Sequence, residues 1–201
     1  MCGIAGLIHR GKSSDVGNEL QLMLQALKHR GPDSTGYALY ADNDGENFIM
    51  RFKVGENVGE GSTSVNEDDS VYDKRKELVD QMLKNLNATV VKEEKLTPYS
   101  YRYEMKYDQD LMEFSKKIES IESVEILSIG KSLELIKDLG DARAVSERYD
   151  LGKVKGTHGI GHARMATESG VDIKSAHPFW GYPFSDVSVV HNGQLTNYWN
   201  N

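Results

Sequence analysis

The only cysteine of the 201-residue chain stands at position 2, directly after Met1. A small second residue permits removal of the initiator methionine, and that cleavage would leave Cys2 with both a thiol and a free α-amino group. Because an α-amine has a reference pKa of about 7.7–8.0 and a thiol one of about 8.5, the amine can accept the thiol proton near neutral pH. One residue could then supply both nucleophile and general base. The alternative is that Cys2 is a small apolar residue at the start of a buried strand.

Short motifs near both ends of the chain accompany this cysteine. They are CGIAGL after Met1, RGPDSTG at 30–36, HARMAT at 162–167, SAHPF at 175–179 and HNGQLTNY at 191–198. Together, and in this order behind a cysteine at position 2, the motifs resemble class II glutamine amidotransferases. The long segment between RGPDSTG and HARMAT is most similar to the glutamate-synthase branch of that family.

The resemblance implies that Cys2 attacks the amide carbon of glutamine and forms a γ-glutamyl thioester. It assigns the side-chain amide of Asn192 and the backbone N–H of Gly193 to an oxyanion hole, which stabilises the negative charge that develops on the carbonyl oxygen. Taken by itself, an Asn-Gly pair between VSVV and QLTNYW also fits a hairpin turn, because the pair favours positive φ. The two interpretations are compatible.

Two arginines and a threonine receive supporting roles from the same resemblance. Arg164 would hold the α-carboxylate of glutamine in a two-pronged contact, which suits a planar guanidinium. Thr167 would help to hold the same carboxylate, and Arg30 would support the position of Cys2. The structural alternatives are an ordinary salt bridge for Arg164 and a turn position for Arg30.

The chain departs from the family pattern around substrate binding. Met165 and Glu168 stand where many members have tryptophan and histidine. The acidic residue that the family uses to bind the α-amine of glutamine would lie beyond Asn201. We therefore expect residues 1–201 to form one glutamine amidotransferase type 2 domain, either truncated at its C-terminal end or completed by a partner chain.

The elements that must position these residues follow from apolar periodicity and from glycine and proline breakers. We expect a strand at 2–9, a helix at 18–29, a strand pair at 36–41 and 47–54, a polar linker at 55–73, a helix at 74–87, strands at 88–93 and 99–107, a helix at 109–122, a strand at 123–129, and helical pieces at 131–138 and 141–149. The resemblance implies an α+β fold, the four-layer αββα sandwich of N-terminal-nucleophile hydrolases. Residues 55–128 would then form a small inserted α+β subdomain.

Composition narrows the class of protein further. The chain has 24 Lys and Arg against 31 Asp and Glu, a net charge of −7, which argues against a nucleic-acid-binding protein. No apolar run approaches the roughly 18 residues of a membrane span, and the N-terminus lacks the basic stretch of a secretory signal. A single cysteine excludes an internal disulfide, and His158 and His162 lack the glutamate of a metalloprotease motif. We expect a cytoplasmic protein without a metal or other cofactor.

The leading hypothesis is a glutaminase domain that hydrolyses L-glutamine to L-glutamate and ammonia and supplies the ammonia to a synthase subunit of the glutamate-synthase type. Two alternatives stay open. The same fold could hydrolyse another amide, with Arg164 holding a different carboxylate, or it could be a non-catalytic module for glutamine binding or assembly.

Overall fold

The computed structural model describes residues 2–31, 33–43, 45–55, 68–165 and 173–193. Over these ranges the chain is an α+β protein whose strands form two four-stranded sheets and one two-stranded sheet. Every strand pair is antiparallel. No helix in the described ranges combines the length and the apolar character that a membrane crossing requires.

The first sheet carries both the start of the chain and the HARMAT segment. Its strand order is β1-β8-β2-β7, with β1 at Gly3–Ile8, β8 at Gly156–Arg164, β2 at Ser34–Ala41 and β7 at Leu133–Leu139. Gly3 pairs with Ala163, and Ser34 pairs with both Arg164 and Leu139. The beginning of β1 therefore lies at the same end of the sheet as the last residue of β8.

The second sheet is built mostly from the middle of the chain. Its strand order is β4-β5-β3-β6, with β4 at Thr89–Thr97, β5 at Ser100–Lys106, β3 at Phe48–Lys53 and β6 at Glu125–Gly130. The two-stranded sheet pairs β9, Phe179–Trp180, with β10, Ser188–Val189. The strands expected at 88–93, 99–107 and 123–129 are confirmed, although the first of them extends to Thr97. The strand pair expected at 36–41 and 47–54 is wrong: both strands form, but β2 and β3 belong to different sheets and do not pair with each other.

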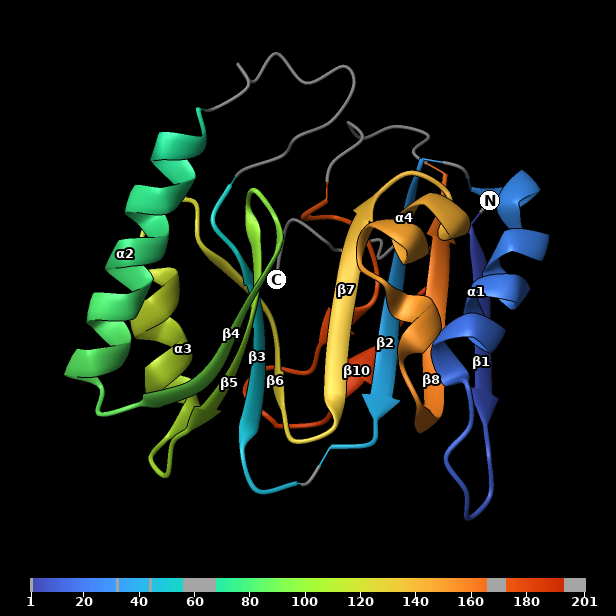
Figure 1. Ribbon diagram of the computed structural model, residues 1–201. Helices are drawn as coiled ribbons and strands as arrows, with labels where there is room; N and C mark the ends of the chain where they lie inside the picture. Colours follow the sequence, from blue (N-terminus) through green and yellow to red (C-terminus); the bar gives the residue numbers. More distant parts are fainter. Residues whose placement is uncertain (1, 32, 44, 56–67, 166–172, 194–201) are drawn as a thin grey trace.

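Helices cover the outer face of each large sheet, so the described elements stack in four layers (Figure 1). Helices α2 (Asp69–Asn85) and α3 (Leu111–Glu119) cover the second sheet, and α1 (Val16–Ala26) and α4 (Ala142–Arg148) cover the first. Two 3₁₀ helices, η1 at Lys28–Arg30 and η2 at Leu151–Lys153, follow α1 and α4. The layer order matches the expected αββα arrangement.

Apolar periodicity explains how the helices dock. In α1, Val16, Leu20 and Leu24 recur at four-residue spacing and are fully buried against the first sheet. Aspartates begin three helices: Asp68, Asp110 and Asp141 each accept a hydrogen bond from a first-turn backbone N–H of α2, α3 and α4. A smaller cluster with Ala38, Leu127, Leu133 and Leu135 fills part of the space between the sheets.

The helix expected at 131–138 is wrong, because this segment forms β7 and its connection to β6. In the structure both acids of this segment are buried and paired: Glu134 bonds Arg51 and Arg102 of the second sheet, and Asp138 bonds Arg148 of α4. Long-range ion pairing, which local spacing does not reveal, thus places the segment in a sheet.

The polar linker expected at 55–73 is also partly wrong. Residues 56–67 lie outside the described ranges, but α2 already begins at Asp69 with Asp68 as its cap. Within 55–128, strands β4, β5 and β6 join β3, which precedes that range, in one sheet. The boundary of an inserted subdomain stays a prediction.

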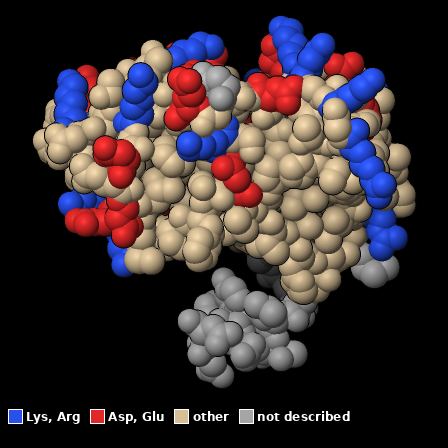
Figure 2. Space-filling model, turned by 90° about the horizontal axis from the view of Figure 1, so that it is seen from below, with Lys and Arg blue, Asp and Glu red and all other residues tan. Residues whose placement is uncertain are grey.

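Charged side chains of both signs are interspersed over the end of the molecule that carries the β2–β3 and β6–β7 connections (Figure 2).

Besides the ion pairs of Glu134, a second ionic group lies between the sheets. It joins Lys53 of β3 and Lys137 of β7 to Glu125 of β6, with Nζ–Oε distances of 2.9 and 3.2 Å. The interior between the sheets is therefore partly ionic rather than uniformly apolar.

Candidate active site

Cys2 lies immediately before β1, at the end of the first sheet where β8 finishes. Because Gly3 pairs with Ala163, Cys2 stands beside the C-terminal end of β8. Its side chain is partly exposed, and the thiol points to the main-chain oxygen of Met165 with an Sγ–O distance of 4.0 Å. This partial exposure fits a reactive thiol better than the alternative of a small buried apolar residue.

Asn192 reaches Cys2 from the opposite end of the sequence. Its Nδ2 donates a 3.0 Å hydrogen bond to the main-chain oxygen of Cys2, across a separation of 190 residues. Gly193 follows with a φ of +156°, a conformation that glycine adopts readily. The structure therefore brings the Asn-Gly pair to Cys2, whereas its role as an oxyanion hole stays a prediction. The alternative hairpin turn would involve residues from 194 onward, which lie outside the described ranges.

Arg164 is the last residue of β8, which lies between β1 and β2 in the first sheet. It is 8% exposed and lies opposite Ser34 in the strand register. Alternation along β8 puts Arg164 on the same face as His162 and Ile160, and Ile160 packs in the cluster between the two sheets. Arg164 is thus next to Cys2 at the inner face of the first sheet, while Thr167 lies outside the described residues.

The RGPDSTG loop packs on the backbone at the end of β8. A Cβ at Gly31 would lie 2.5 Å from the carbonyl carbon of Arg164 and 2.6 Å from the oxygen of Ala163, so only glycine fits there. Asp33 N donates a 3.2 Å hydrogen bond to Arg164 O. Arg30 ends η1 directly before this contact. The loop fixes the end of the strand that carries Arg164, and the supporting role of Arg30 toward Cys2 stays a prediction.

Three histidines that received no role from the sequence gather at this end of the sheet. The rings of His162 and His177 stack with their centroids 4.8 Å apart, and His177 Nδ1 accepts a 3.2 Å hydrogen bond from the backbone N–H of His191. His162 is 1% exposed, and the main chain of His191 contacts its ring. The signal in the sequence was their placement inside the HARMAT, SAHPF and HNG motifs.

Burial controls the charge of two of these imidazoles. It lowers the pKa of His162 to about 4 and the pKa of His177 to about 4, and nearby positive charge, including that of Arg164, acts in the same direction. Both rings are consequently neutral at pH 7. Arg164 therefore supplies positive charge at this end of the sheet, whereas the rings of His162 and His177 do not.

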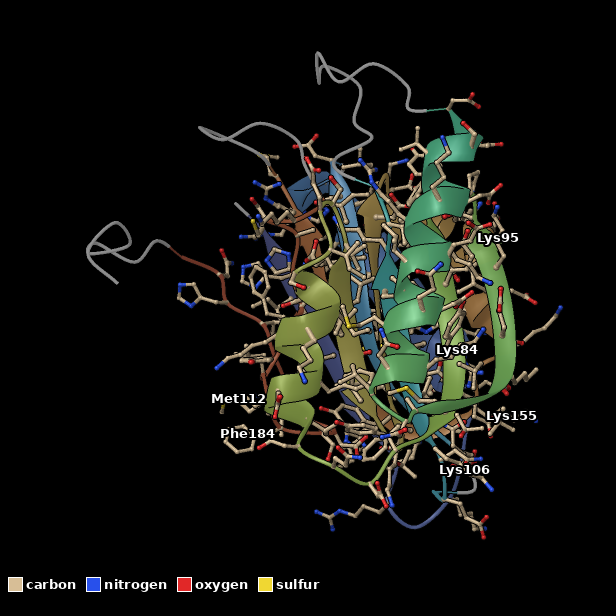
Figure 3. The ribbon with its side chains drawn as sticks, turned by 90° about the vertical axis from the view of Figure 1, so that its left-hand side faces the viewer. Lys84, Lys95, Lys106, Met112, Lys155 and Phe184 are labelled. Carbon is tan, nitrogen blue, oxygen red and sulfur yellow. The ribbon has the colours of Figure 1, made fainter. Side chains whose placement is uncertain are left out.

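The segment 173–193 carries Asn192 to Cys2 and is fastened to the fold on the way. Asp186 accepts hydrogen bonds from the backbone N–H groups of Lys131, Ser132 and Leu133 at the β6–β7 connection. Tyr182 Oη donates a 3.2 Å hydrogen bond to the main-chain oxygen of Met112 in α3. In the view of Figure 3, Met112 of α3 and Phe184 of this segment both appear at the lower left. These contacts fix the path of the chain before it reaches the site.

Within the described ranges, no group of three or more His, Cys, Asp or Glu side chains is arranged so that it could hold a metal ion. His158 and His162 both lie on β8, and the ring of His158 stacks on Tyr40 with a centroid distance of 3.9 Å.

No family model matches the chain, but comparison with known proteins gives relatives whose names include glutamine amidotransferase. The chain is 38% identical over 213 residues to a protein of Methanothermobacter thermautotrophicus whose provisional name is glutamine amidotransferase, covering 99% of the chain and 63% of that protein. It is 30% identical to the glutamine amidotransferase-like protein GlxB of Rhizobium meliloti, over 98% of the chain and 60% of that protein. A shorter match, 35% identical over 78 residues, joins 38% of the chain to 13% of the glutamine–fructose-6-phosphate aminotransferase of Methanococcus maripaludis.

The chain thus spans less than two thirds of the length of the first two relatives. Both carry glutamine amidotransferase in their names, and the partial matches extend to the aminotransferase above and to amidophosphoribosyltransferases. At family level, these similarities support placing the chain among the class II glutamine amidotransferases.

Proposed function

We propose that this chain is a glutaminase domain that hydrolyses L-glutamine to L-glutamate and ammonia at Cys2. The observation that carries the proposal is the 3.0 Å contact between the Asn192 side-chain amide and the Cys2 main chain. This contact brings together two residues from opposite ends of the sequence, and in the proposal Cys2 is the nucleophile and Asn192 the donor. Relatives named for glutamine amide transfer supply the substrate class.

The reaction begins once Met1 has been removed. The free α-amine of Cys2 takes the thiol proton, and the thiolate attacks the amide carbon of glutamine. Asn192 Nδ2 and Gly193 N–H donate to the resulting oxyanion. When the tetrahedral intermediate collapses, the carbon–nitrogen bond breaks, the proton passes to the leaving nitrogen, and ammonia departs. Water then attacks the γ-glutamyl thioester, which releases glutamate and restores the thiol.

Arg164 and Thr167 hold the α-carboxylate of glutamine in this proposal, and Arg30 supports the position of Cys2. The burial of Arg164 at the inner face of the first sheet suits this task, because a charge-assisted contact gains strength where water is excluded. The four layers support the N-terminal-nucleophile hydrolase fold. Ammonia passes to a synthase subunit or domain of the glutamate-synthase type.

Labelling with an electrophilic glutamine analogue tests the proposal directly. Because Cys2 is the only cysteine, an adduct on a thiol can form at one position only. We expect an intact mass without Met1, one equivalent of adduct, protection by excess glutamine and no adduct in Cys2→Ala. Retention of Met1, or labelling that glutamine does not slow, would overturn the mechanism. Ammonia release from glutamine, compared with asparagine as the matched control, separates a glutaminase from a binding module and from a different amidase.

A further inference from the structure

A continuous set of contacts links His177 to Cys2. His177 Nδ1 accepts the hydrogen bond from the backbone N–H of His191, and the next residue, Asn192, donates its side-chain amide to the main-chain oxygen of Cys2. The respective distances are 3.2 and 3.0 Å. One imidazole nitrogen therefore anchors the residue that immediately precedes the predicted oxyanion donor.

His177 is itself held from several sides. Its main chain crosses directly over β2 at Gly36, where a Cβ would lie 2.0 Å from His177 O. Its ring stacks on buried His162 of β8 and meets the ring of Phe179 edge-on, with a centroid distance of 4.4 Å. In the register of the sheet, Gly36 lies between His162 of β8 and Lys137 of β7. Because glycine has no side chain, the main chain of His177 can pass close over this position. Contacts with the first sheet therefore fix the position of His177 Nδ1, and this atom in turn holds the exposed residues around His191.

We propose that His177 is a positioning residue, whose Nδ1 holds the His191 main chain and thereby places the Asn192 amide at Cys2. His177 does not touch the reacting atoms. The kinetic consequences of this role rest on the proposed glutaminase function. The placement of Asn192 does not depend on that function, and it can be measured without enzymatic turnover.

The protonation state required for this role agrees with the surroundings of the ring. Nδ1 can accept a hydrogen bond only when it is unprotonated, so the neutral ring carries its proton on Nε2. The charged and titratable groups that act on His177 are His162 and Arg164 of β8, Lys137 of β7, and His191. Together with burial they lower its pKa to about 4, so that the acceptor is available throughout the neutral range.

Two variants separate hydrogen bonding from packing. His177→Asn keeps an acceptor oxygen near the position of Nδ1, whereas His177→Leu fills a similar volume without an acceptor. Amide hydrogen exchange is measured at the His191 N–H. In the wild type we expect this N–H to be protected from exchange at pH 6 and to lose that protection below pH about 4. The protection should be absent in His177→Leu and should return in part in His177→Asn.

Kinetics with glutamine supply the second measurement. We expect kcat to fall about tenfold in His177→Leu with little change in KM, because one hydrogen bond of ordinary net strength is worth about that factor. His177→Asn should recover most of this loss. The rate of Cys2 alkylation by iodoacetamide should be equal in all three proteins, since this reagent does not use the oxyanion donors.

Two results would overturn the inference: protection of the His191 N–H that survives in His177→Leu, or equal impairment of both variants. Absence of glutaminase activity in the wild type, with the expected exchange pattern intact, would instead overturn the proposed function and leave the placement of Asn192 by His177 supported.

Discussion

The amide nitrogen of Asn192 lies 3.0 Å from the main-chain oxygen of Cys2, although the two residues are 190 positions apart in the sequence. The contact joins the edge of the first sheet to a segment that is fastened to the β6–β7 connection through Asp186. The proximity of these two residues therefore depends on the whole sandwich and on the path of residues 173–193.

Replacing Asn192 tests its predicted role as an oxyanion donor. Asn192→Ala should lower kcat for glutamine hydrolysis about 10²–10³-fold with little change in KM, because the donor acts mainly in the transition state. Steady-state ammonia release measures the effect. Asn43→Ala is the matched control, since Asn43 bonds Lys131 O at the opposite end of the sheet and should leave both parameters unchanged. A loss confined to KM would contradict the oxyanion role.

Replacing Arg164 tests the carboxylate contact. Arg164→Lys keeps the charge but loses the planar two-pronged geometry, so KM for glutamine should rise about tenfold or more while kcat changes less. Arg143→Lys, at an exposed position of α4, provides the control. If glutamine and its α-decarboxylated analogue react equally well in the wild type, the role of Arg164 is wrong.

The buried histidines predict a pH dependence of stability. The pKa of His162 is about 4 in the fold against about 6.5 for an ordinary histidine, so the unfolded chain binds protons first as the pH falls. The free energy of unfolding should therefore be highest above pH 6.5 and should decline from there toward pH 4. Urea titrations at several pH values measure the slope. His162→Phe should reduce it, whereas His29→Asn, at an exposed position, should not.

The ion pair between Arg51 and Glu134 predicts a large effect on stability. Burial alone would raise the pKa of Glu134, but Arg51 and Arg102 outweigh it and hold that pKa at about 2. Glu134→Gln would take from Arg51 the carboxylate it is paired with and would leave Arg102 with Glu94 alone, so it should lower the free energy of unfolding by about 3–5 kcal/mol. The exposed pair of Lys117 and Glu113 is the control, and Glu113→Gln should cost less than about 1 kcal/mol. Equal effects of the two substitutions would refute this assignment.

The sequence allowed much of the local structure to be predicted, because its signals are local. Periodicity identified α1 and the two strands β2 and β3, but the pairing expected between these strands is wrong, because they lie in different sheets. The segment 131–138 was misassigned because its acids find their partners on other strands and on α4. Local spacing carries no information about such partners.

The candidate site shows the same division. The position of Cys2 and the motifs made Asn192 and Arg164 candidates, and the structure places both beside Cys2. The contribution of His177 could not be predicted, because it depends on a chain crossing at Gly36 that only the folded register creates. Thr167 lies in a range that the structure does not describe.

The late segment is anchored to the fold a few residues before the point where it reaches Cys2. Strand β10 ends at Val189, and Ser188 is bonded to Tyr40, so only residues 190–193 of the described segment lie beyond the last fastening point. Within residues 190–193, the hydrogen bonds from His191 to His177 and from Asn192 to Cys2 tie this short stretch to the first sheet. Two such bonds are worth about 1–3 kcal/mol together, so the placement of the Asn192 amide depends on far less free energy than the pairing of the strands around it.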